Sequence, residues 1–331
     1  MTTSRETILS IRNLTVTYKT RMGNLNAVDN LSLDLYKGEV LGLVGESGCG
    51  KSTLGKAIMR MILPPGQITS GEIWMDGRDL MKLNKKEMRD VRGNRIGMIF
   101  QDPMTSLNPV QRIDKHIIEA IQAHEPHVSK EEANQRAIEL VERLGIGRKR
   151  LLDYPHQLSG GMRQRVMIAL ALALKAQVII ADEATTALDA IVEAKFLDLL
   201  RELKEEFGLT ILMITHNIGI VAELADRVAV MYAGRIAELA DVDTLFHAPK
   251  HPYTQGLLAS VPNINMDSEL YCMDGTPPNL ISPPSGCRFH PRCPHVMDIC
   301  REQHPPFIPQ ALDNGEQEVA CWLYESATEQ T

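Results

Sequence analysis

The sequence predicts an α/β fold built around a phosphate-binding loop, followed by an irregular extension rich in cysteine and proline. Two observations predict the α/β part. Strand-like and helix-like segments alternate up to about residue 245, and a glycine-rich loop joins a buried strand to a helix. A third observation predicts the extension, because twelve of the 18 prolines and five of the six cysteines lie in residues 246–331. We therefore expect two domains, 1–245 and 246–331.

Composition narrows the functional classes. Of the 331 residues, 44% are hydrophobic and 23% are charged, which is ordinary for a globular protein, and the net charge of -7 argues against a nucleic-acid partner. The start, "MTTSRETILS", has no basic stretch before an apolar core, so no secretory signal is expected. The longest apolar run is interrupted at Lys175 and is too short to span a bilayer. Any membrane role is therefore expected to depend on a partner.

A strand is predicted at "LSIRNLTVTY" (9–18), with Leu14, Val16 and Tyr18 on one face. The next strand leads into "GESGCGKS" (45–52), which fits G-x-x-x-x-G-K-S/T, with a helix pattern after it. Such a loop curls backbone N–H groups around phosphates, while its lysine reaches the β- and γ-phosphates and its serine reaches Mg²⁺. The residues expected to bind ATP are Gly45, Ser47, Gly48, Cys49, Gly50, Lys51, Ser52 and Thr53.

Two further buried strands end in polar residues. "QVIIADE" (177–183) places Asp182 to bind Mg²⁺ and Glu183 to act as general base on the attacking water, because ligands bind at the carboxyl ends of parallel strands. The alternative, a solvated acidic turn, is disfavoured beside a phosphate loop. "LTILMITHNIG" (209–219) ends in Thr215-His216, where the histidine is either structural or a partner of the γ-phosphate.

The segment "LSGGMRQR" (158–165) narrows the interpretation. Together with the phosphate loop, "FQDP" (100–103), "VIIADE", "TALD" (186–189) and "ITH" (214–216), it resembles an ABC transporter ATPase over residues 1 to about 245. The resemblance implies a P-loop NTPase core, in which a RecA-like parallel sheet is joined by an antiparallel β subdomain. It also implies a helical subdomain inserted at about 104–157, where "KHIIEAIQAHEP" and "KEEANQRAIELVERLGI" have helical spacing and Gly145 is a plausible stop. That subdomain would receive a membrane subunit; the alternative is a simple helical cap.

The resemblance also assigns roles. The signature residues Ser159, Gly160 and Gly161 would close over ATP bound by a second ATPase subunit. Gln101 would sense Mg²⁺ and the nucleophilic water, Asp189 would couple the two sites, and His216 would join Glu183 in catalysis. Tyr18 would stack on adenine, the alternative being a core-facing aromatic. The chain departs from the family at Met162, usually glutamine, and at Ala184, commonly proline.

The segments "FQDPMTSLNPV", "HPYTQGLL" and "SGCRFHPRCPHVMDIC" resemble ATPase subunits of dipeptide and oligopeptide importers, and "GMRQRVMIA" resembles the D-type subunit. This implies an ATP-driven motor on the cytoplasmic face of the cell membrane. Its partners would be a different second ATPase, two transmembrane permease subunits and, indirectly, an extracytoplasmic substrate-binding protein. Some members import nickel or oligosaccharides, so the substrate stays open. Two other classes stay open as alternatives: a non-transport ABC ATPase in DNA or translation processes, and a redox-sensing module.

The extension carries Cys287, Cys293, Cys300 and Cys321, spaced C-x₅-C-x₆-C-x₂₀-C. Because disulfides are disfavoured in the cytosol, four thiols in this pattern indicate a metal site that is either zinc or a four-iron four-sulfur (4Fe-4S) cluster. Related importer ATPases carry such a cluster, so the resemblance favours iron–sulfur. His290, His295 and His304 are expected to be surface residues or neighbours of the ligands, and Cys272 a free thiol. The expected role is to staple a proline-rich segment that buries little core.

Overall fold

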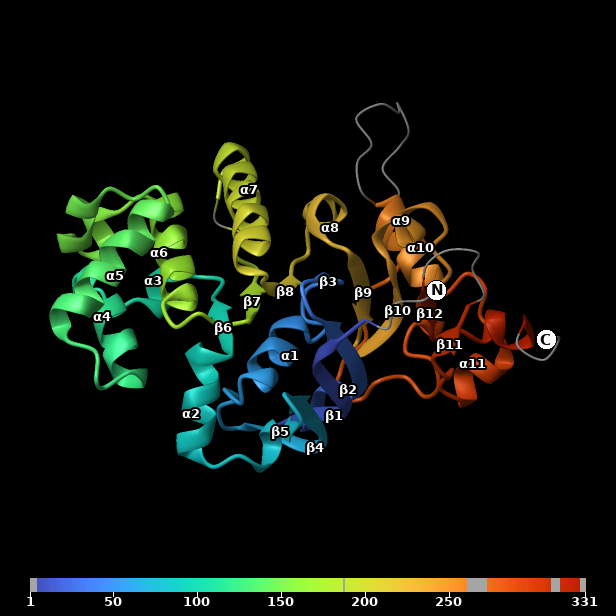
Figure 1. The fold of residues 1–331 in the computed structure, drawn as a ribbon. Helices are drawn as coiled ribbons and strands as arrows, with labels where there is room; N and C mark the ends of the chain where they lie inside the picture. Colours follow the sequence, from blue (N-terminus) through green and yellow to red (C-terminus); the bar gives the residue numbers. More distant parts are fainter. Residues whose placement is uncertain (1–4, 187, 261–272, 311–315, 328–331) are drawn as a thin grey trace. The chain divides into compact units, whose positions relative to one another are not determined.

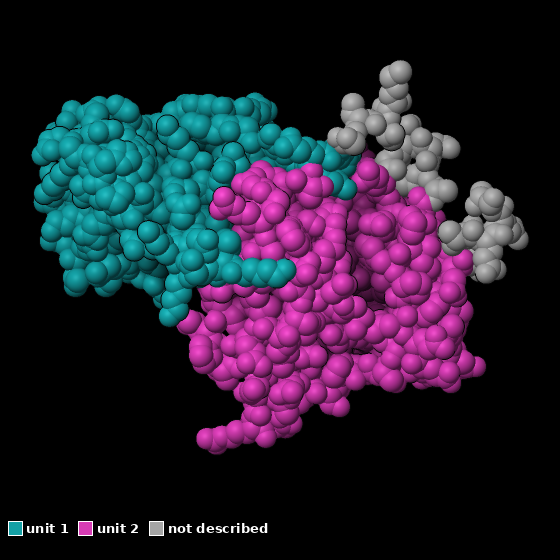
Figure 2. All heavy atoms as spheres, turned by 60° about the horizontal axis from the view of Figure 1, so that its bottom comes forward, with its two compact units in different colours: residues 1–6, 36–39, 82–214 teal, residues 7–35, 40–81, 215–331 magenta. Residues whose placement is uncertain are grey.

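The computed structural model describes residues 5–186, 188–260, 273–310 and 316–327. The chain forms two compact units, each discontinuous in sequence (Figure 2). Unit 1 contains residues 1–6, 36–39 and 82–214, and unit 2 contains residues 7–35, 40–81 and 215–331. The boundary near residue 246 and the insertion at about 104–157 remain predictions.

Unit 1 contains three parallel strands in the order β8-β7-β6, where β6 is Ile96–Ile99, β7 is Val178–Asp182 and β8 is Thr210–Ile214. Every residue of the three strands is buried, as expected for parallel strands covered on both faces. The strands predicted within 177–183 and 209–219 are therefore confirmed as β7 and β8, although β8 ends at Ile214, just before the predicted Thr215-His216. Asp182 lies at the carboxyl end of β7, and Glu183 follows it.

The helices of unit 1 are labelled in Figure 1, and the buried residues of α4 and α5 follow the apolar spacing of the sequence. The α4–α5 pair buries Ile117 and Ile121 of one helix and Ala137 and Val141 of the other. Helix α5 ends at Arg143, and Gly145 after it has φ +71°, so the predicted glycine stop is confirmed. The helices are α2 (Lys85–Asn94), α3 (Pro103–Ser106), α4 (Ile113–His124), α5 (Lys130–Arg143), α6 (Gly160–Leu172) and α7 (Ala190–Phe207), with 3₁₀ turns at Leu80–Lys82 in unit 2 and at Arg148–Leu152 and Pro155–Gln157 in unit 1.

Unit 2 contains an antiparallel four-stranded sheet in the order β2-β1-β4-β5. Its strands are β1 (Thr7–Thr20), β2 (Gly23–Tyr36), β4 (Gly66–Met75) and β5 (Arg78–Asp79). Strand β1 extends two residues beyond the predicted 9–18 at each end. Leu14 and Val16 are fully buried, and Tyr18 is half-buried.

A second sheet in unit 2 runs in the order β11-β12-β10-β9-β3, with β3 and β9 parallel and the other pairs antiparallel. Its strands are β3 (Val40–Val44), β9 (Arg227–Tyr232), β10 (Arg235–Asp241), β11 (Ile308–Pro309) and β12 (Gln317–Val319). The helices are α1 (Lys51–Ile58), α8 (Ile218–Leu224), α9 (Val242–His247), α10 (Pro252–Ala259) and α11 (Asp298–Glu302), with 3₁₀ turns at His290–Arg292 and Trp322–Ala327.

The extension is more regular than the sequence predicts, because β12 adds to β10 and β11 adds to β12. Strands of two and three residues are too short to show the alternation by which strands are recognised. Buried contacts anchor this region. Asp29 of β2 forms ion pairs with Arg235 of β10 and with Arg288 of the extension. The rings of Tyr232, Tyr253 and Phe289 pack with centroids 4.5–5.5 Å apart.

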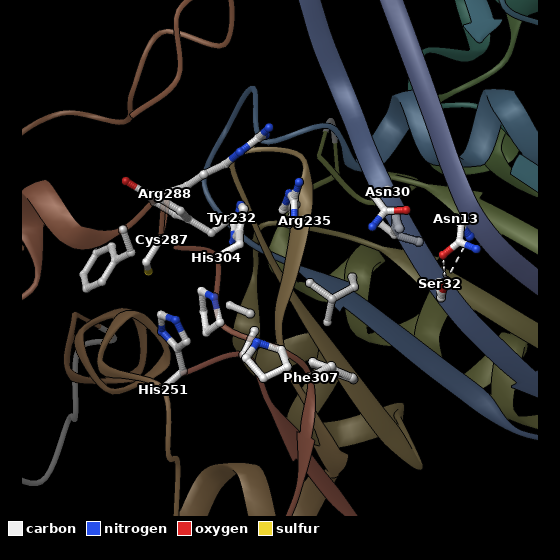
Figure 3. Close-up of a pocket in the computed structure, with 17 residues that line it drawn as sticks. Asn13, Asn30, Ser32, Tyr232, Arg235, His251, Cys287, Arg288, His304 and Phe307 are labelled. Atoms are coloured by element: carbon white, nitrogen blue, oxygen red, sulfur yellow. Dashed lines mark hydrogen bonds between the residues drawn. The ribbon is translucent and has the colours of Figure 1, made fainter. Parts of the chain in front are cut away.

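Beside these anchors lies a cavity of about 270 Å³ (Figure 3). Arg235, Arg288 and His304 lie on one side of it, and Asn30 and Ser32 of β2 lie on the other. The cavity marks where the extension meets the two sheets of unit 2. In the part of the chain that the structure describes, no helix is both long and apolar enough to cross a bilayer.

Candidate nucleotide site and cysteine cluster

The phosphate loop lies in unit 2 between β3 and α1, and its glycines are required by its shape. Gly45, Gly48 and Gly50 have φ of +150°, +78° and +111°. A Cβ at Gly45 would lie 2.1 Å from the carbonyl oxygen of Met231, and one at Gly50 would lie 2.0 Å from that of Ala27. The backbone therefore takes a curve that only glycine permits. Helix α1 begins at Lys51 after Gly50, so its first N–H groups point into the loop, as in an anion site.

Lys51 is buried and its ammonium lies inside the loop. Its Nζ donates to the carbonyl oxygens of Gly45 at 2.7 Å and Glu46 at 3.0 Å. Burial raises the pKa of the neighbouring Cys49 thiol, and Lys51 opposes that rise. Cys49 therefore remains a neutral thiol at pH 7 and adds no negative charge to the loop. Ser52 and Thr53 follow in the first turn of α1, where a hydroxyl can reach a metal–nucleotide complex.

Glu46 is a loop residue for which the sequence predicts no role. Its N–H donates to the hydroxyl oxygen of Tyr253 at 2.9 Å. Its carboxylate accepts two hydrogen bonds from the guanidinium of Arg292, at 2.9 and 3.0 Å. The loop is thus fixed by α10 and by the cysteine-rich segment. A carboxylate within a phosphate loop is a signal that a cation is needed nearby, but the sequence does not show which cation.

Glu183 lies in unit 1 in a strained backbone conformation. Its φ is +47°, in the left-handed region that non-glycine residues seldom adopt, and such strain clusters at functional sites. The Nε2 of Gln101 donates to its Oε2 at 2.8 Å, and the hydroxyl of Thr186 lies 3.4 Å from the same oxygen. The structure therefore brings together two of the three predicted catalytic residues. Asp182, which directly precedes Glu183, is buried at the end of β7.

The signature residues begin α6 of unit 1. Ser159 caps the helix by accepting a hydrogen bond from the N–H of Met162 at 3.3 Å. A Cβ at Gly161 would lie 2.7 Å from Val192 of α7, so this glycine permits close helix packing. A Cβ at the exposed Gly160 would meet no described atom within 4 Å. Packing within the described chain therefore does not explain Gly160, whose open backbone suits approach by another molecule.

Asp189, His216 and Tyr18 lie at a helix start, in a turn and on a strand, respectively. Asp189 caps α7 by accepting a hydrogen bond from the N–H of Val192 at 3.0 Å. His216 is exposed after β8, in the turn that leads to α8. The ring of Tyr18 lies against Gly66 of β4, where an added Cβ would lie 2.6 Å from it. The structure thus gives Asp189 a structural role and leaves the proposed functions of all three as predictions.

The four cysteines of the extension line one narrow cavity, which is also lined by His251, His290 and His295. Cys287, Cys293, Cys300 and Cys321 share it with Phe289, Trp322 and Leu323 among others. All four are free thiols, and the N–H of Cys287 donates to the carbonyl of Cys300 at 2.8 Å. Gly286, with φ +63°, permits this approach, because a Cβ there would lie 2.4 Å from that carbonyl. Burial raises the pKa of Cys287 to about 11 and that of Cys321 to about 12.

The arrangement of these thiols tests which metal they suit. Among the described residues, which include all four cysteines, no three donors are grouped as a site for one metal ion. Tetrahedral zinc requires every sulfur at about 2.3 Å from a single ion. A four-iron cluster takes one thiolate at each iron and so suits more widely spaced sulfurs. The four thiols line one cavity, but the described residues form no grouped donor set that supports either zinc or a four-iron cluster. Cys272 lies outside the described residues.

Comparison with known proteins agrees with this geometry. Residues 28–186 match the family model described as ABC transporter, and residues 237–300 match the one described as oligopeptide/dipeptide transporter, C-terminal region. An oligopeptide transport ATP-binding protein, OppD of Bacillus subtilis (strain 168), is 49% identical over 91% of this chain and 85% of its own length. A dipeptide transport ATP-binding protein, DppD of the same organism, is 45% identical over 98% of this chain and 97% of its own.

The solved structures give the same fold. A dimeric ATP-binding cassette in a post-hydrolysis state, bound to ADP and Pi, superposes with a TM-score of 0.64 at 30% identity. It covers 71% of this chain and 99% of the solved one. The predicted P-loop ABC ATPase fold is therefore confirmed. Together with relatives that match nearly the whole length, this shows that the chain belongs to the family of oligopeptide and dipeptide transport ATP-binding proteins of ABC transporters.

Proposed function

We propose that the chain is the ATP-hydrolysing motor subunit of an ABC importer for di- or oligopeptides. The observation that carries the proposal is that one chain holds both a glycine-shaped phosphate loop and an exposed signature helix start at Gly160. Family membership supplies the transport context, and the names of the relatives supply the peptide class. Neither nickel nor oligosaccharide import, nor a role in DNA or translation, is favoured by a specific feature of the described residues.

The chemistry of the proposed site follows from its residues. The loop amides and Lys51 would bind the β- and γ-phosphates, and Ser52, Asp182 and Gln101 are the residues that would hold Mg²⁺, which when bound would neutralise charge on the transferred phosphoryl group. Glu183 takes a proton from the attacking water, and Gln101 orients that carboxylate through its 2.8 Å hydrogen bond. His216 contacts the γ-phosphate, and Tyr18 stacks on the adenine.

The signature of this chain is proposed to complete the site of a second ATPase. Ser159 and the backbone of Gly160 and Gly161 would face the γ-phosphate bound by that subunit, with Asp189 coupling the two sites. We infer that the second subunit is a different chain, because the sequence resembles the D-type of a paired set. Two permease subunits would contact the helices of 104–157, and a substrate-binding protein would act indirectly. The motor would thus lie peripherally on the cytoplasmic face of the membrane.

The extension is proposed to hold a 4Fe-4S cluster on Cys287, Cys293, Cys300 and Cys321. Four thiols lining one cavity are the observation that supports it. The role we propose is structural: when bound, the cluster cross-links four points of a segment that has only short strands and helices of its own.

The proposed function is tested by assembling the transporter. The chain is co-expressed with its sister ATPase and both permeases, and ATPase activity is measured in proteoliposomes with a substrate-binding protein. Peptide-loaded binding protein is expected to stimulate hydrolysis. Stimulation only by nickel-loaded or oligosaccharide-loaded binding protein would replace the substrate assignment and keep the motor. The transport role would be contradicted if the two ATPases, without the permeases, gave the same ATPase activity as the whole transporter.

A further inference from the structure

The cysteine-rich extension reaches the phosphate loop through one side chain, Arg292. This arginine directly precedes Cys293, yet its guanidinium forms a bidentate ion pair with Glu46, the second residue of the loop motif. The side chain of Arg292 is 6% exposed and that of Glu46 is 25% exposed. A bidentate, largely desolvated pair is among the stronger polar contacts in proteins and fixes geometry as well as charge.

Arg292 is itself held in place on several sides. Its Nε donates to the carbonyl oxygen of Asp274 at 2.9 Å, and its Nη1 also lies 3.3 Å from the hydroxyl of Tyr232. The guanidinium carbon lies 5.9 Å from the ring centroids of both Tyr232 and Phe289. A side chain restrained this way presents its charge to Glu46 in a single orientation.

The carboxylate, the N–H and the carbonyl oxygen of Glu46 all form hydrogen bonds. Its carboxylate binds Arg292, its N–H donates to Tyr253, and its carbonyl oxygen accepts from Lys51. Pro277, Pro278 and Leu280 of the extension also line a cavity of about 180 Å³ together with Glu46, Ser47 and Gly48. The extension therefore forms one wall of a cavity beside the loop.

We propose that Arg292 is a positioning residue for the nucleotide site: it neutralises Glu46 and holds the loop in the shape that accepts phosphate. Without the arginine, a bare carboxylate would lie in a loop that must receive the negatively charged β- and γ-phosphates, and like charges at this range disfavour binding. The inference rests on the proposed nucleotide site. It adds that ATP affinity depends on an extension residue 246 positions away in sequence.

The test is a double-mutant cycle on the full chain, with ATP affinity measured by titration of a fluorescent ATP analogue with Mg²⁺. Arg292→Ala is expected to weaken binding about tenfold, and Arg292→Lys less, because lysine keeps the charge but loses the bidentate fork. In the Glu46→Gln background, where no negative charge needs neutralising, Arg292→Ala is expected to change affinity less than about twofold. Glu46→Gln alone is expected to bind at least as tightly as the parent.

The matched control is Arg288→Ala. Arg288 also joins the extension to the body of unit 2, but it contacts Asp29 and the carbonyl oxygen of Ala233 and not the loop. It is expected to lower the denaturation midpoint and to leave ATP affinity within about twofold of the parent. Equal weakening by Arg292→Ala in the parent and in the Glu46→Gln background would overturn the proposal, as would parent-like affinity in Arg292→Ala. If Arg292→Ala does not fold, the ATP affinity of Arg292→Lys is measured in the parent and Glu46→Gln backgrounds. Equal weakening in both backgrounds, or parent-like affinity, would again overturn the proposal.

The Lys51→Ala variant in the same titration distinguishes failure of the proposed nucleotide site from failure of the inference about Arg292. Lys51→Ala with parent-like affinity would remove the nucleotide site itself. Loss of binding in Lys51→Ala together with an uncoupled Arg292 would remove only the inference about the extension.

Discussion

The side-chain amide of Gln101 donates to Oε2 of Glu183 over 2.8 Å, although the two residues lie 82 positions apart. Gln101 therefore contacts one carboxylate oxygen of Glu183, Oε2, and not the other, Oε1. Since Glu183 also has a left-handed backbone, both its main chain and its side chain are restrained. This pairing supports a carboxylate held in one orientation for proton transfer.

Glu183→Gln is expected to lower the ATPase kcat by roughly 10²–10⁴ while ATP binding is preserved, because the amide cannot accept the proton of the attacking water. Single-turnover hydrolysis and nucleotide affinity are measured together, and size-exclusion chromatography with ATP reports trapped dimer. Glu205→Gln, an exposed change in α7, is the control and should match the parent. Parent-rate hydrolysis by Glu183→Gln would falsify the base assignment.

Lys51→Ala is expected to lower ATP affinity at least about 100-fold, because the buried ammonium supplies positive charge inside the loop for the phosphates. The same titration on Lys56→Ala, an exposed lysine on the same helix, should give the parent value. If both variants bind ATP equally well, the phosphate-binding role of the loop is wrong.

Gly160→Asp is expected to preserve ATP binding and to abolish hydrolysis of nucleotide held by the sister ATPase, because a carboxylate would face the γ-phosphate of that subunit. The exposed position tolerates a side chain, so the variant should keep the parent denaturation midpoint. The measurement is the ATPase rate of the mixed pair, with Gly147→Asp as control, since a Cβ at Gly147 also meets no described atom. A homodimer of this chain with full activity would contradict the need for a sister.

Anaerobic purification is expected to yield brown protein with broad absorption at roughly 400 nm and about four irons per chain. Cys300→Ser should lose the colour and the iron, whereas Cys49→Ser, which changes a thiol outside the cysteine cavity, should keep both. Colourless protein with one zinc per chain would replace the cluster by zinc. Protein without metal and with an unchanged denaturation midpoint would remove the metal site altogether.

Acid is expected to destabilise the extension through His251. Burial lowers the pKa of this histidine from 6.5 to about 4, and its Nδ1 accepts the N–H of Tyr253, so protonation breaks a helix cap. Because the folded pKa lies below the unfolded one, the stabilisation is present above pH 6.5 and is lost as pH falls toward 4. The loss at pH 5 is about 2 kcal/mol.

The measurement is the urea midpoint at pH 7 and pH 5, followed by the fluorescence of Trp322 in a Trp74→Phe background. His251→Gln should show a smaller change between the two pH values, whereas the exposed His247→Gln should keep the parent change. Burial and nearby arginines also lower the pKa of His304 to about 4, so part of the dependence should remain in His251→Gln. An identical pH response in His251→Gln and the parent would contradict this assignment.

Local patterns determined much of the fold and of the candidate site. The phosphate loop is a contiguous motif of eight residues, so it can be recognised from the sequence. Its three glycines have positive φ angles, and an added Cβ at Gly45 or Gly50 would lie about 2 Å from a carbonyl oxygen. The strands β7 and β8, which end at Asp182 and Ile214, could be predicted for a similar reason, since a parallel strand buried on both faces is an unbroken apolar run. The spacing of the four cysteines was enough to predict that they lie close together.

Tertiary structure decided the features that join distant segments. Strands β11 and β12 are too short to carry a pattern and exist because β10 offers them an edge. The pairing of Gln101 with Glu183 and that of Arg292 with Glu46 span 82 and 246 residues. An arginine beside a cysteine carries no local mark of its acceptor, because an ion pair depends on where the folded backbone brings two side chains together. The sequence alone thus identified the phosphate loop and the four thiols, and only the fold showed that the cysteine-rich segment contacts the loop.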